Sequence, residues 1–564
     1  MSSTMSSTTT SAIEQARSLI QQAQQSLNAA LSFLKQESLV NGRVNGDKLD
    51  RKQLACYEVA YCEAEITAAK VMLDYSQKVK AEKGGSDLRI EERLALQYTA
   101  EALQNCRGRF NARRADFGFS REQLRASLDS DAVDAFINQY LSTESLEAVG
   151  KAVLHNDGFT GEYMLDHEKE MMRDQFRSFA SNVVAPLAEK IHTHDLDIPD
   201  AIIKPLVELG CFGLSIPMQY GGIQPDDSED NLGMIVVTEE LSRGSLGAAG
   251  SLITRPEIMA RALLKGGTEE QKQHWLPKLA QAEPLNAVAV TEPNFGSDVA
   301  SMKLKATQVD GGWILDGEKT WCTFAGRAGV LLTLARTNAD PASGHRGLTM
   351  FLVEKPSFPG HAFEYKQPQG GTITGKAIPT IGYRGMHSFT VFFDHYFVPD
   401  SHVLGGKEGI GNGFYYTMAG FSGGRIQTAA RATGVMQAAF EKALSYSKER
   451  QVFGKPIGDY QLTLVKIARM AMLLAVSRQF TYHVARLMDE GKGQMEASLV
   501  KLYSCKSSEW LAREAMQIHG GMGYAEETSV SRYYIDARVL SIFEGAEETL
   551  ALKVIAKALV ENAA

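Results

Sequence analysis

Hydrophobic periodicity changes twice along this 564-residue chain. Up to about Pro284, apolar residues recur at the three- to four-residue spacing of buried helices. From there to about residue 400 they form short runs separated by Gly, Pro and Asp turns, which is typical of an antiparallel sheet or barrel. Helical spacing returns at Gly413. The chain is therefore predicted to be mostly α with one β domain, and the lack of strand–helix–strand alternation disfavours a doubly wound nucleotide fold.

The chain is predicted to contain four domains. The first boundary is at the turn-forming residues 155–158, and the later ones are where the hydrophobic spacing changes. The first is an all-helical N-terminal extension without metal pairs, a phosphate loop or a catalytic dyad, so we expect it to serve packing or interaction. The predicted domains cover residues 1–157 (extension), 158–284 (helical domain), 285–402 (middle β domain) and 403–564 (C-terminal helical domain).

Individual elements follow from the same periodicity and from the turn and capping residues between them. The expected helices cover residues 11–82 (two helices joined by Asn-Gly turns), 87–109, 165–190, 199–209, 228–242, 413–449, 459–490, 493–518, 526–537 and 546–561. The expected strands cover residues 285–291, 303–308, 313–315, 331–335, 348–353 and 388–393.

Composition excludes several classes of protein. The 59 basic and 67 acidic residues give a net charge of -8 without a basic tract, which disfavours a nucleic-acid surface. The six cysteines lack ligand-like spacing, so we expect reduced thiols in a cytoplasmic protein and no metal site. The Ser/Thr-rich start lacks an apolar core and no run of about eighteen apolar residues occurs, so neither secretion nor membrane spanning is expected.

A single carboxylate near the C-terminus, Glu544, is the candidate catalytic base. It lies between Phe543 and Gly545, where a new helix should begin. A Glu at such a position is usually a solvated charge favoured by the helix dipole. Its function therefore depends on whether the rest of the chain builds a site around it.

Two stretches of the β domain carry residue types that suit a planar polar ligand. In Ala289–Asp298, hydroxyl groups and a glycine end a strand, and glycine permits close approach of the backbone. In Lys319–Thr323, an indole stands beside a hydroxyl, a pair that can cover a flavin ring and donate to its reactive nitrogen. A tight turn and a core tryptophan are the respective alternatives.

Two further stretches suit a phosphate group. Gln517–Tyr524 interrupts a helix with three glycines, each costing about 1 kcal/mol there, which favours a close backbone approach. Arg450, the first residue of the stretch 450–454, supplies a cation at a helix end. An ordinary interhelix turn and a surface charge are the alternatives.

Together these stretches resemble the acyl-CoA dehydrogenases, flavoproteins that introduce a 2,3-double bond into acyl-CoA thioesters. The resemblance covers about residues 160–564 with the motifs in the family's order. The C-terminal motif matches from Gln517 through Asp536, and the motif at 289–301 matches except at Phe295. The resemblance implies a helical domain, a middle β domain and a C-terminal four-helix bundle, with FAD as cofactor and electron transfer flavoprotein as acceptor.

The resemblance also implies roles for particular residues. Glu544 would remove the α-proton with Gly545 beside the substrate, and Arg425 would lie on the CoA side. Relatives with the base on another helix carry Glu at the position of Gly424, which leaves Glu544 as the candidate here. The implied FAD contacts are Val290, Thr291 and Ser297 along the flavin, Trp321 and Thr323 at its ring, and Arg450, Phe453, Gln517, Gly520 and Gly521, of which Arg450 would reach the FAD of a neighbouring subunit.

This sequence departs from the family pattern at Ala546 and Glu548 after the base, and at Met386-His387. Those contacts cannot be transferred.

Within the family, a helical leader of this length resembles the branch that oxidises (2S)-methylsuccinyl-CoA to mesaconyl-CoA in the ethylmalonyl-CoA pathway. A free carboxylate on the acyl chain requires a cation, and Arg255 is the candidate, with a surface arginine at a helix break as the alternative. We expect a homo-oligomer, a dimer rather than a tetramer. The alternatives are a dehydrogenase for another short or branched acyl-CoA, an acyl-CoA oxidase, and a non-catalytic relative that binds FAD and nucleic acid.

Overall fold

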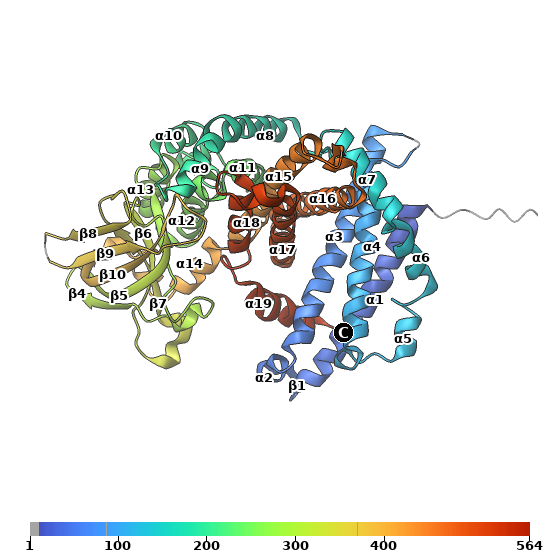
Figure 1. Ribbon diagram of the computed structural model, residues 1–564. Helices are drawn as coiled ribbons and strands as arrows, with labels where there is room; N and C mark the ends of the chain where they lie inside the picture. Colours follow the sequence, from blue (N-terminus) through green and yellow to red (C-terminus); the bar gives the residue numbers. More distant parts are fainter. Residues whose placement is uncertain (1–10, 86, 369) are drawn as a thin grey trace, which may run out of the picture.

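The computed structural model describes residues 11–85, 87–368 and 370–564. The β domain and the N-terminal extension lie at opposite ends of the molecule, with the remaining helices between them (Figure 1). The predicted order of helical, β and helical regions is confirmed. The Ser/Thr-rich start falls almost wholly outside the described residues. No helix in the described ranges combines the length and the apolar character needed to cross a bilayer.

The extension is all-helical apart from one small hairpin. Ser11 and Glu14 form a capping box that starts its first helix. The Asn-Gly turn at Asn41 and Gly42 has positive φ at both residues and closes the hairpin, which the sequence did not predict. Its elements are α1 (Ala12–Ser38), β1 (Leu39–Val40), β2 (Arg43–Val44), α2 (Gly46–Asp50), α3 (Gln53–Lys83), α4 (Ile90–Ala112), α5 (Arg121–Arg125), α6 (Asp131–Tyr140) and α7 (Thr143–His155).

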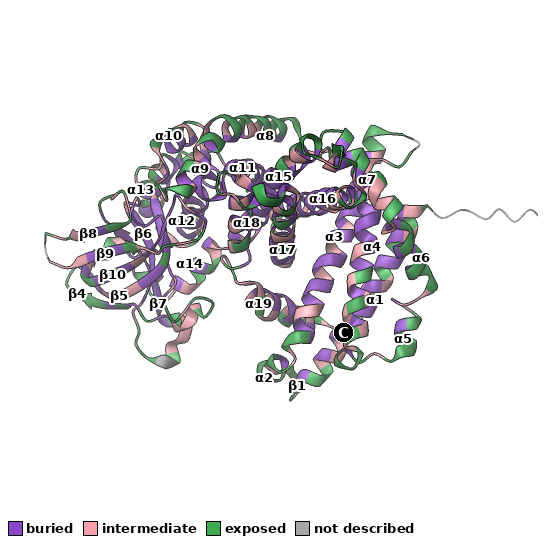
Figure 2. Cartoon of the chain, viewed as in Figure 1, coloured by how far each residue is buried: buried purple, intermediate pink, exposed green. Residues whose placement is uncertain are grey.

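The extension shares its hydrophobic core with the C-terminal helices. Buried residues from α1, α3 and α4 join one cluster with buried residues of the C-terminal region, and they form the continuous buried stripes on these helices (Figure 2). Helix α3 contacts two long C-terminal helices and the final segment of the chain, and α7 packs along one of the same helices. The extension is therefore packed into the body of the protein.

The second helical region supplies the top of the molecule in Figure 1. The helices predicted over 165–190, 199–209 and 228–242 are observed with similar boundaries, and no boundaries were predicted for the two helices that follow them. The observed helices are α8 (His167–Phe179), continued by a π-helical turn into α9 (Ala185–Thr193), then α10 (Asp200–Glu208), α11 (Asn231–Gly244), α12 (Thr254–Gly266) and α13 (Glu269–Ala280).

The middle region is an eight-stranded sheet in the order β3-β6-β4-β5-β10-β9-β8, with β7 on β6. It packs against α12 and α13 through apolar residues on one face. The strands are β3 (Asn286–Ala289), β4 (Lys305–Val309), β5 (Gly312–Thr323), β6 (Val330–Arg336), β7 (Leu348–Glu354), β8 (Ala362–Lys366), β9 (Thr372–Ala377) and β10 (Ser388–Pro399).

Two expectations about this sheet are wrong. The sheet is mixed, because β3 pairs in parallel with β6; the hairpin of β4 and β5 lies between them in sequence and lets the chain return in the same direction. Strands β8 and β9 were not predicted, because these last two strands of the sheet, with β8 at its edge, bury few apolar side chains, chiefly Phe363 and Ile373.

The C-terminal region consists of helices with a small hairpin. The expected single helix over 413–449 is wrong, because the chain breaks at Phe421–Gly423 between two helices. The elements are α14 (Gly413–Gly420), α15 (Gly424–Glu449), β11 (Gln451–Val452), β12 (Lys455–Pro456), α16 (Gln461–Asp489), α17 (Gln494–His519), α18 (Ser529–Val539), α19 (Glu547–Thr549), a π-helical segment Leu550–Ala556 and α20 (Lys557–Asn562).

The docking of α7 on α16 depends on Gly150, because a Cβ there would overlap the carbonyl of Leu464. Gly150→Ala should lower the free energy of unfolding by about 1–3 kcal/mol through overpacking. Gly108→Ala is the matched control, since Gly108 is exposed on α4 with open space around it and should gain up to about 1 kcal/mol. Urea unfolding midpoints of the two variants check this, and equal shifts would contradict the close contact.

Candidate active site

Glu544 lies in the loop between α18 and α19, and its side chain turns inward. The side chain is 6% exposed, and the residue has the left-handed φ of 53°. Both facts contradict the alternative of a solvated charge at a helix start. A non-glycine residue in this conformation is held there by its surroundings.

Two adjacent glycines make room for two buried carboxylates. A Cβ on Gly424 would lie 2.8 Å from Oε2 of Glu544, and a Cβ on Gly423 would overlap the carboxylate of Glu257. Glu257 accepts a hydrogen bond of 2.8 Å from Arg261, and burial raises its pKa although Arg261 opposes the shift. This crowding accounts for the glycines at the break before α15.

Arg255 and Arg425 lie on either side of this carboxylate. Nη1 of Arg255 is 3.9 Å from Oε1 of Glu544, and its Nη2 donates to Tyr383 at 3.4 Å. Its Nε is buried and has no partner among the described residues. The surface alternative for Arg255 is therefore wrong. Nη1 of Arg425 donates to Ser498 at 2.9 Å, and burial lowers the pKa of Arg425 while Glu544 opposes the shift.

Lys501 fixes the loop that carries Glu544, and the sequence did not predict this. Its Nζ donates to the carbonyl of Phe543 at 2.9 Å and also to the carbonyl of Gly545, the two neighbours of Glu544. Burial lowers the pKa of Lys501, with Glu544 among the groups that oppose the shift. The only signal in the sequence is a lysine inside an apolar helical run.

The two flavin-like stretches of the β domain lie side by side. The backbone N–H of Thr320, near the end of β5, donates to the carbonyl of Thr291 at 2.9 Å. Val290, the preceding residue, therefore also lies beside the end of β5. Trp321 has positive φ and a 55% exposed side chain, so it is not a core residue. The hydroxyls of Thr323 and Ser388 are 2.9 Å apart beneath it. An uncovered indole next to buried hydroxyls fits a planar ring system such as that of FAD.

The same region reaches the segment after Glu544. The hydroxyl of Thr549, on α19, donates to Ser297 at 3.2 Å. Gly545 is exposed, with φ of 99° and open space at its Cα. The fold thus brings the 289–301 loop into contact with the segment that follows the candidate base.

The other predicted FAD residues form a second group, at the ends of α15 and α17. Stacking of Tyr446 on His519, with ring centroids 4.3 Å apart, holds these ends together. Phe453 is 95% exposed at the tip of the β11–β12 hairpin. Its companions are Arg450, Gln517, Gly520 and Gly521, all exposed, with nothing within 4 Å of a Cβ at either glycine. Within the described ranges, no hydrogen bond or ion pair joins this group to Trp321 and its neighbours, and the group is free to contact a ligand held elsewhere.

Two residues of the C-terminal motif serve structure. Asp536 is buried and accepts a 2.7 Å hydrogen bond from the backbone of Tyr383, while buried Arg532 pairs with Glu189 at 2.8 Å. These contacts place the ring of Tyr383 edge-on to Phe543, 5.4 Å between centroids.

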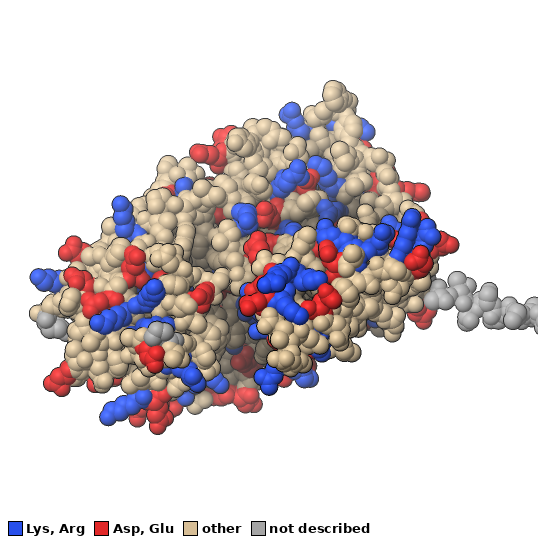
Figure 3. Space-filling view, turned by 90° about the horizontal axis from the view of Figure 1, so that it is seen from below, with Lys and Arg blue, Asp and Glu red and all other residues tan. Residues whose placement is uncertain are grey.

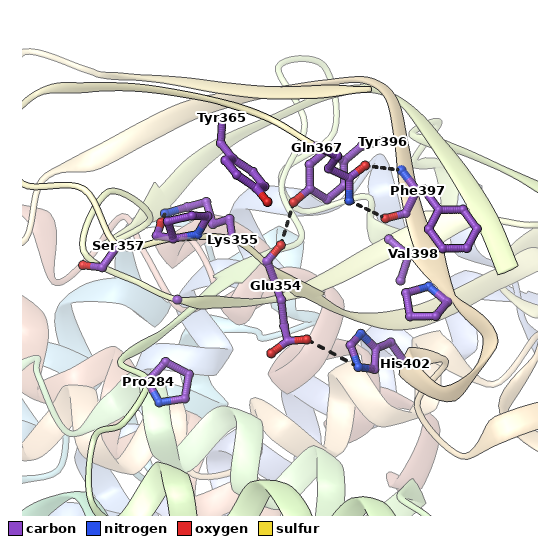
Figure 4. Close-up of a pocket in the computed structure, with 13 residues that line it drawn as sticks. Pro284, Glu354, Lys355, Ser357, Tyr365, Gln367, Tyr396, Phe397, Val398 and His402 are labelled. Atoms are coloured by element: carbon purple, nitrogen blue, oxygen red, sulfur yellow. Dashed lines mark hydrogen bonds and ion pairs between the residues drawn. The ribbon is translucent and has the colours of Figure 1, made fainter. Parts of the chain in front are cut away.

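A separate cleft of about 630 Å³ lies in the β domain (Figure 4). Tyr396 donates to the carbonyl of Glu354, whose carboxylate is 3.5 Å from His402. None of the predicted FAD or substrate residues lines this cleft. Elsewhere, Asp195, His361 and His387 have potential ligand atoms within 4.8 Å of one another, so the expectation of no metal stays a prediction.

Charge is mixed on the face shown in Figure 3. Lys and Arg side chains alternate with Asp and Glu, and a hollow separates the β domain from the helical part. This face has no continuous basic field of the kind that binds nucleic acid.

Profiles of three domain families match the chain. The acyl-CoA dehydrogenase N-terminal domain matches residues 166–283, the middle domain 287–396 and the C-terminal domain 411–560.

Individual relatives match over different lengths. The (2S)-methylsuccinyl-CoA dehydrogenase of Cereibacter sphaeroides is 39% identical over 94% of this chain and 95% of its own. The mitochondrial 2-methylacyl-CoA dehydrogenase of Solanum tuberosum is 34% identical over 69% of this chain and 90% of its own. A glutaryl-CoA dehydrogenase from Mycobacterium smegmatis, solved in complex with FADH2, superposes with a TM-score of 0.62 at 26% identity, covering 70% of this chain and 96% of its own.

Gly424→Ala tests the contact between Gly424 and Glu544. The added methyl group meets the end of a flexible side chain, so the free energy of unfolding should change by less than about 1 kcal/mol, while the carboxylate is pushed aside. Flavin reduction by an acyl-CoA should slow at least about ten-fold, because a displacement of about 1 Å has large effects on rate. Stopped-flow spectroscopy of FAD-loaded protein measures this, and a wild-type rate would show that the contact is unimportant.

Proposed function

Because the chain belongs to the acyl-CoA dehydrogenase family, we propose that it oxidises (2S)-methylsuccinyl-CoA to mesaconyl-CoA. The relative of that activity matches 94% of this chain and therefore includes most of the extension, whereas the match to the 2-methylacyl-CoA dehydrogenase covers 69%. This difference in coverage supports the substrate assignment. Enzymes of the family bind acyl-CoA and use FAD.

Glu544 is the proposed base for the α-proton. Its carboxylate is buried, its backbone has a left-handed φ, and Arg255, Arg425 and Lys501 supply positive charge around it, which supports a carboxylate positioned before substrate arrives. Trp321 and Thr323 would hold the flavin ring of FAD, which would supply the acceptor for the hydride of the β-carbon.

The substrate carbonyl must be polarised as the α-proton leaves, since negative charge develops on its oxygen. The backbone N–H of Glu544 donates to no acceptor among the described residues and is available to do this. The base and one donor for the developing charge thus come from the same residue.

Arg255 is the proposed partner of the substrate's free carboxylate. In a methylsuccinyl thioester this carboxylate is attached to the β-carbon, so a cation that binds it must lie within a few ångströms of the base. Arg255 meets this requirement at 3.9 Å from Glu544, and its unpartnered Nε leaves hydrogen-bonding capacity for a second carboxylate.

The remaining proposals follow from the family and from the cysteines. Electron transfer flavoprotein is the proposed acceptor, and a homodimer in the cytoplasm is the proposed state. All six cysteines are buried and unpaired, which supports a reducing compartment. The exposed Phe453 and Arg450 support a contact with the FAD of a second subunit.

Glu544→Gln should bind FAD normally and lose about 10²–10⁴-fold in the rate of flavin reduction, because the amide cannot take the α-proton. Anaerobic bleaching of the flavin by (2S)-methylsuccinyl-CoA measures the rate. A near-normal rate in this variant would remove Glu544 from the mechanism. Peroxide formation by wild-type protein in air would favour the oxidase alternative.

Arg255→Ala should lower kcat/KM for (2S)-methylsuccinyl-CoA about 10- to 100-fold more than for butyryl-CoA, because only the former carries a free carboxylate. Steady-state kinetics on both thioesters check this. Equal losses on the two substrates would assign Arg255 to the support of Glu544 instead of to the substrate.

A further inference from the structure

Glu547, three residues after the candidate base, is held by the N-terminal extension. Its Oε1 accepts hydrogen bonds from the hydroxyls of Tyr57 and Tyr61, the second at 2.8 Å, and lies 3.5 Å from Nζ of Lys506. The two tyrosines lie four residues apart on α3 and so share one face of that helix. They are almost 500 residues from Glu547 in sequence, with a separation of 490 for Tyr57.

The charges in this group make the contact strong. Burial acts to raise the pKa of Glu547, but the two tyrosine hydroxyls and Lys506 outweigh it and the net pKa is lowered. Burial and Glu547 both raise the pKa of Tyr57 and of Tyr61, so both stay protonated donors. An ionised carboxylate with two phenol donors and a nearby ammonium forms charge-assisted hydrogen bonds, which are about twice as strong as neutral ones.

The chain after Glu547 also lies on the extension. Nζ of Lys553 is 2.6 Å from both carboxylate oxygens of Asp50, and Lys35 donates to the carbonyl of Ala563. Buried residues of the π-helical segment share the core that contains α3. The chain after the candidate base therefore contacts residues of α1, α2 and α3 at several points.

The base itself lies between two anchors. Lys501 holds the carbonyls on either side of Glu544, and the tyrosine pair holds Glu547. A left-handed φ at a non-glycine residue costs of order 1–3 kcal/mol and persists only where the surroundings enforce it.

We propose that the N-terminal extension positions the catalytic loop, with Tyr57 and Tyr61 as positioning residues that act on Glu544 through Glu547. This proposal rests on the proposed role of Glu544 as the base. It gives the extension a function in turnover beyond packing: without the tyrosine hydroxyls, the loop loses the two hydrogen bonds that hold the side chain of Glu547, and the carboxylate of Glu544 samples unproductive positions.

The test is the double variant Tyr57→Phe/Tyr61→Phe, which removes two hydroxyls and keeps both rings in the core. We expect normal FAD content, an unchanged KM and a flavin-reduction rate at least ten-fold lower. The primary isotope effect with α-deuterated substrate should increase, because proton removal becomes more fully rate-limiting. Full-length FAD-loaded protein and (2S)-methylsuccinyl-CoA are used, with stopped-flow detection.

Tyr75→Phe is the matched control. Tyr75 is also buried on α3, and its hydroxyl donates to the carbonyl of Glu162, far from Glu547 in sequence and on a different element. This variant loses a hydrogen bond from the same helix, and its rate and isotope effect should equal those of wild type. If the double variant matches wild type or Tyr75→Phe in rate and isotope effect, the extension only packs and the proposal is overturned.

Glu547→Gln removes the negative charge of Glu547 and keeps the shape of its side chain. The amide keeps an oxygen acceptor for the tyrosines, so its rate should fall between wild type and the double variant, and adding Glu547→Ala to the double variant should cause no further loss. Additive losses would show that the tyrosines act elsewhere. Failure of the proposed function is separately visible, because it would appear as activity retained in Glu544→Gln.

Discussion

The proposed active site depends on keeping one ionisable side chain, Glu544, buried in a strained backbone conformation. A buried carboxylate is costly unless cations and donors surround it. Arg255, Arg425 and Lys501 supply the charge, and Lys501 also fixes the peptide groups next to Glu544. Each of these residues comes from a different helix, so the site forms only when α12, α15 and α17 have packed.

Close packing around this carboxylate explains features that look unrelated in the sequence. The break between α14 and α15 and the two glycines that follow it leave space for the carboxylates of Glu257 and Glu544. Relatives that place the base at the position of Gly424 would fill the space that Glu544 occupies here. A Cβ at Gly424 would lie 2.8 Å from Oε2 of Glu544, so a side chain at that position would push the carboxylate away from the place it has here.

The N-terminal extension packs against the same C-terminal helices. It shares a core with them, and part of its polar contacts go to the segment after the candidate base, from Glu547 to the C-terminus. A segment of three helical residues followed by a π-helical stretch has little stability of its own, because short helices gain few hydrogen bonds for the entropy they lose. Packing on α3 provides the stability that this segment lacks.

The sequence by itself determined the order of helical and β regions and most helix boundaries, and it indicated Glu544 as the candidate base, because periodicity, turn residues and short motifs are local signals. It did not reveal the parallel pairing of β3, the strands β8 and β9 at one end of the sheet, or the break before α15. Only the tertiary structure decided that Arg255 is buried beside the base, that Lys501 clamps the loop, and that Tyr57 and Tyr61 reach Glu547. The physical reason is that these are contacts between residues 42 to 490 positions apart, which depend on how helices pack and leave no periodic trace along the chain.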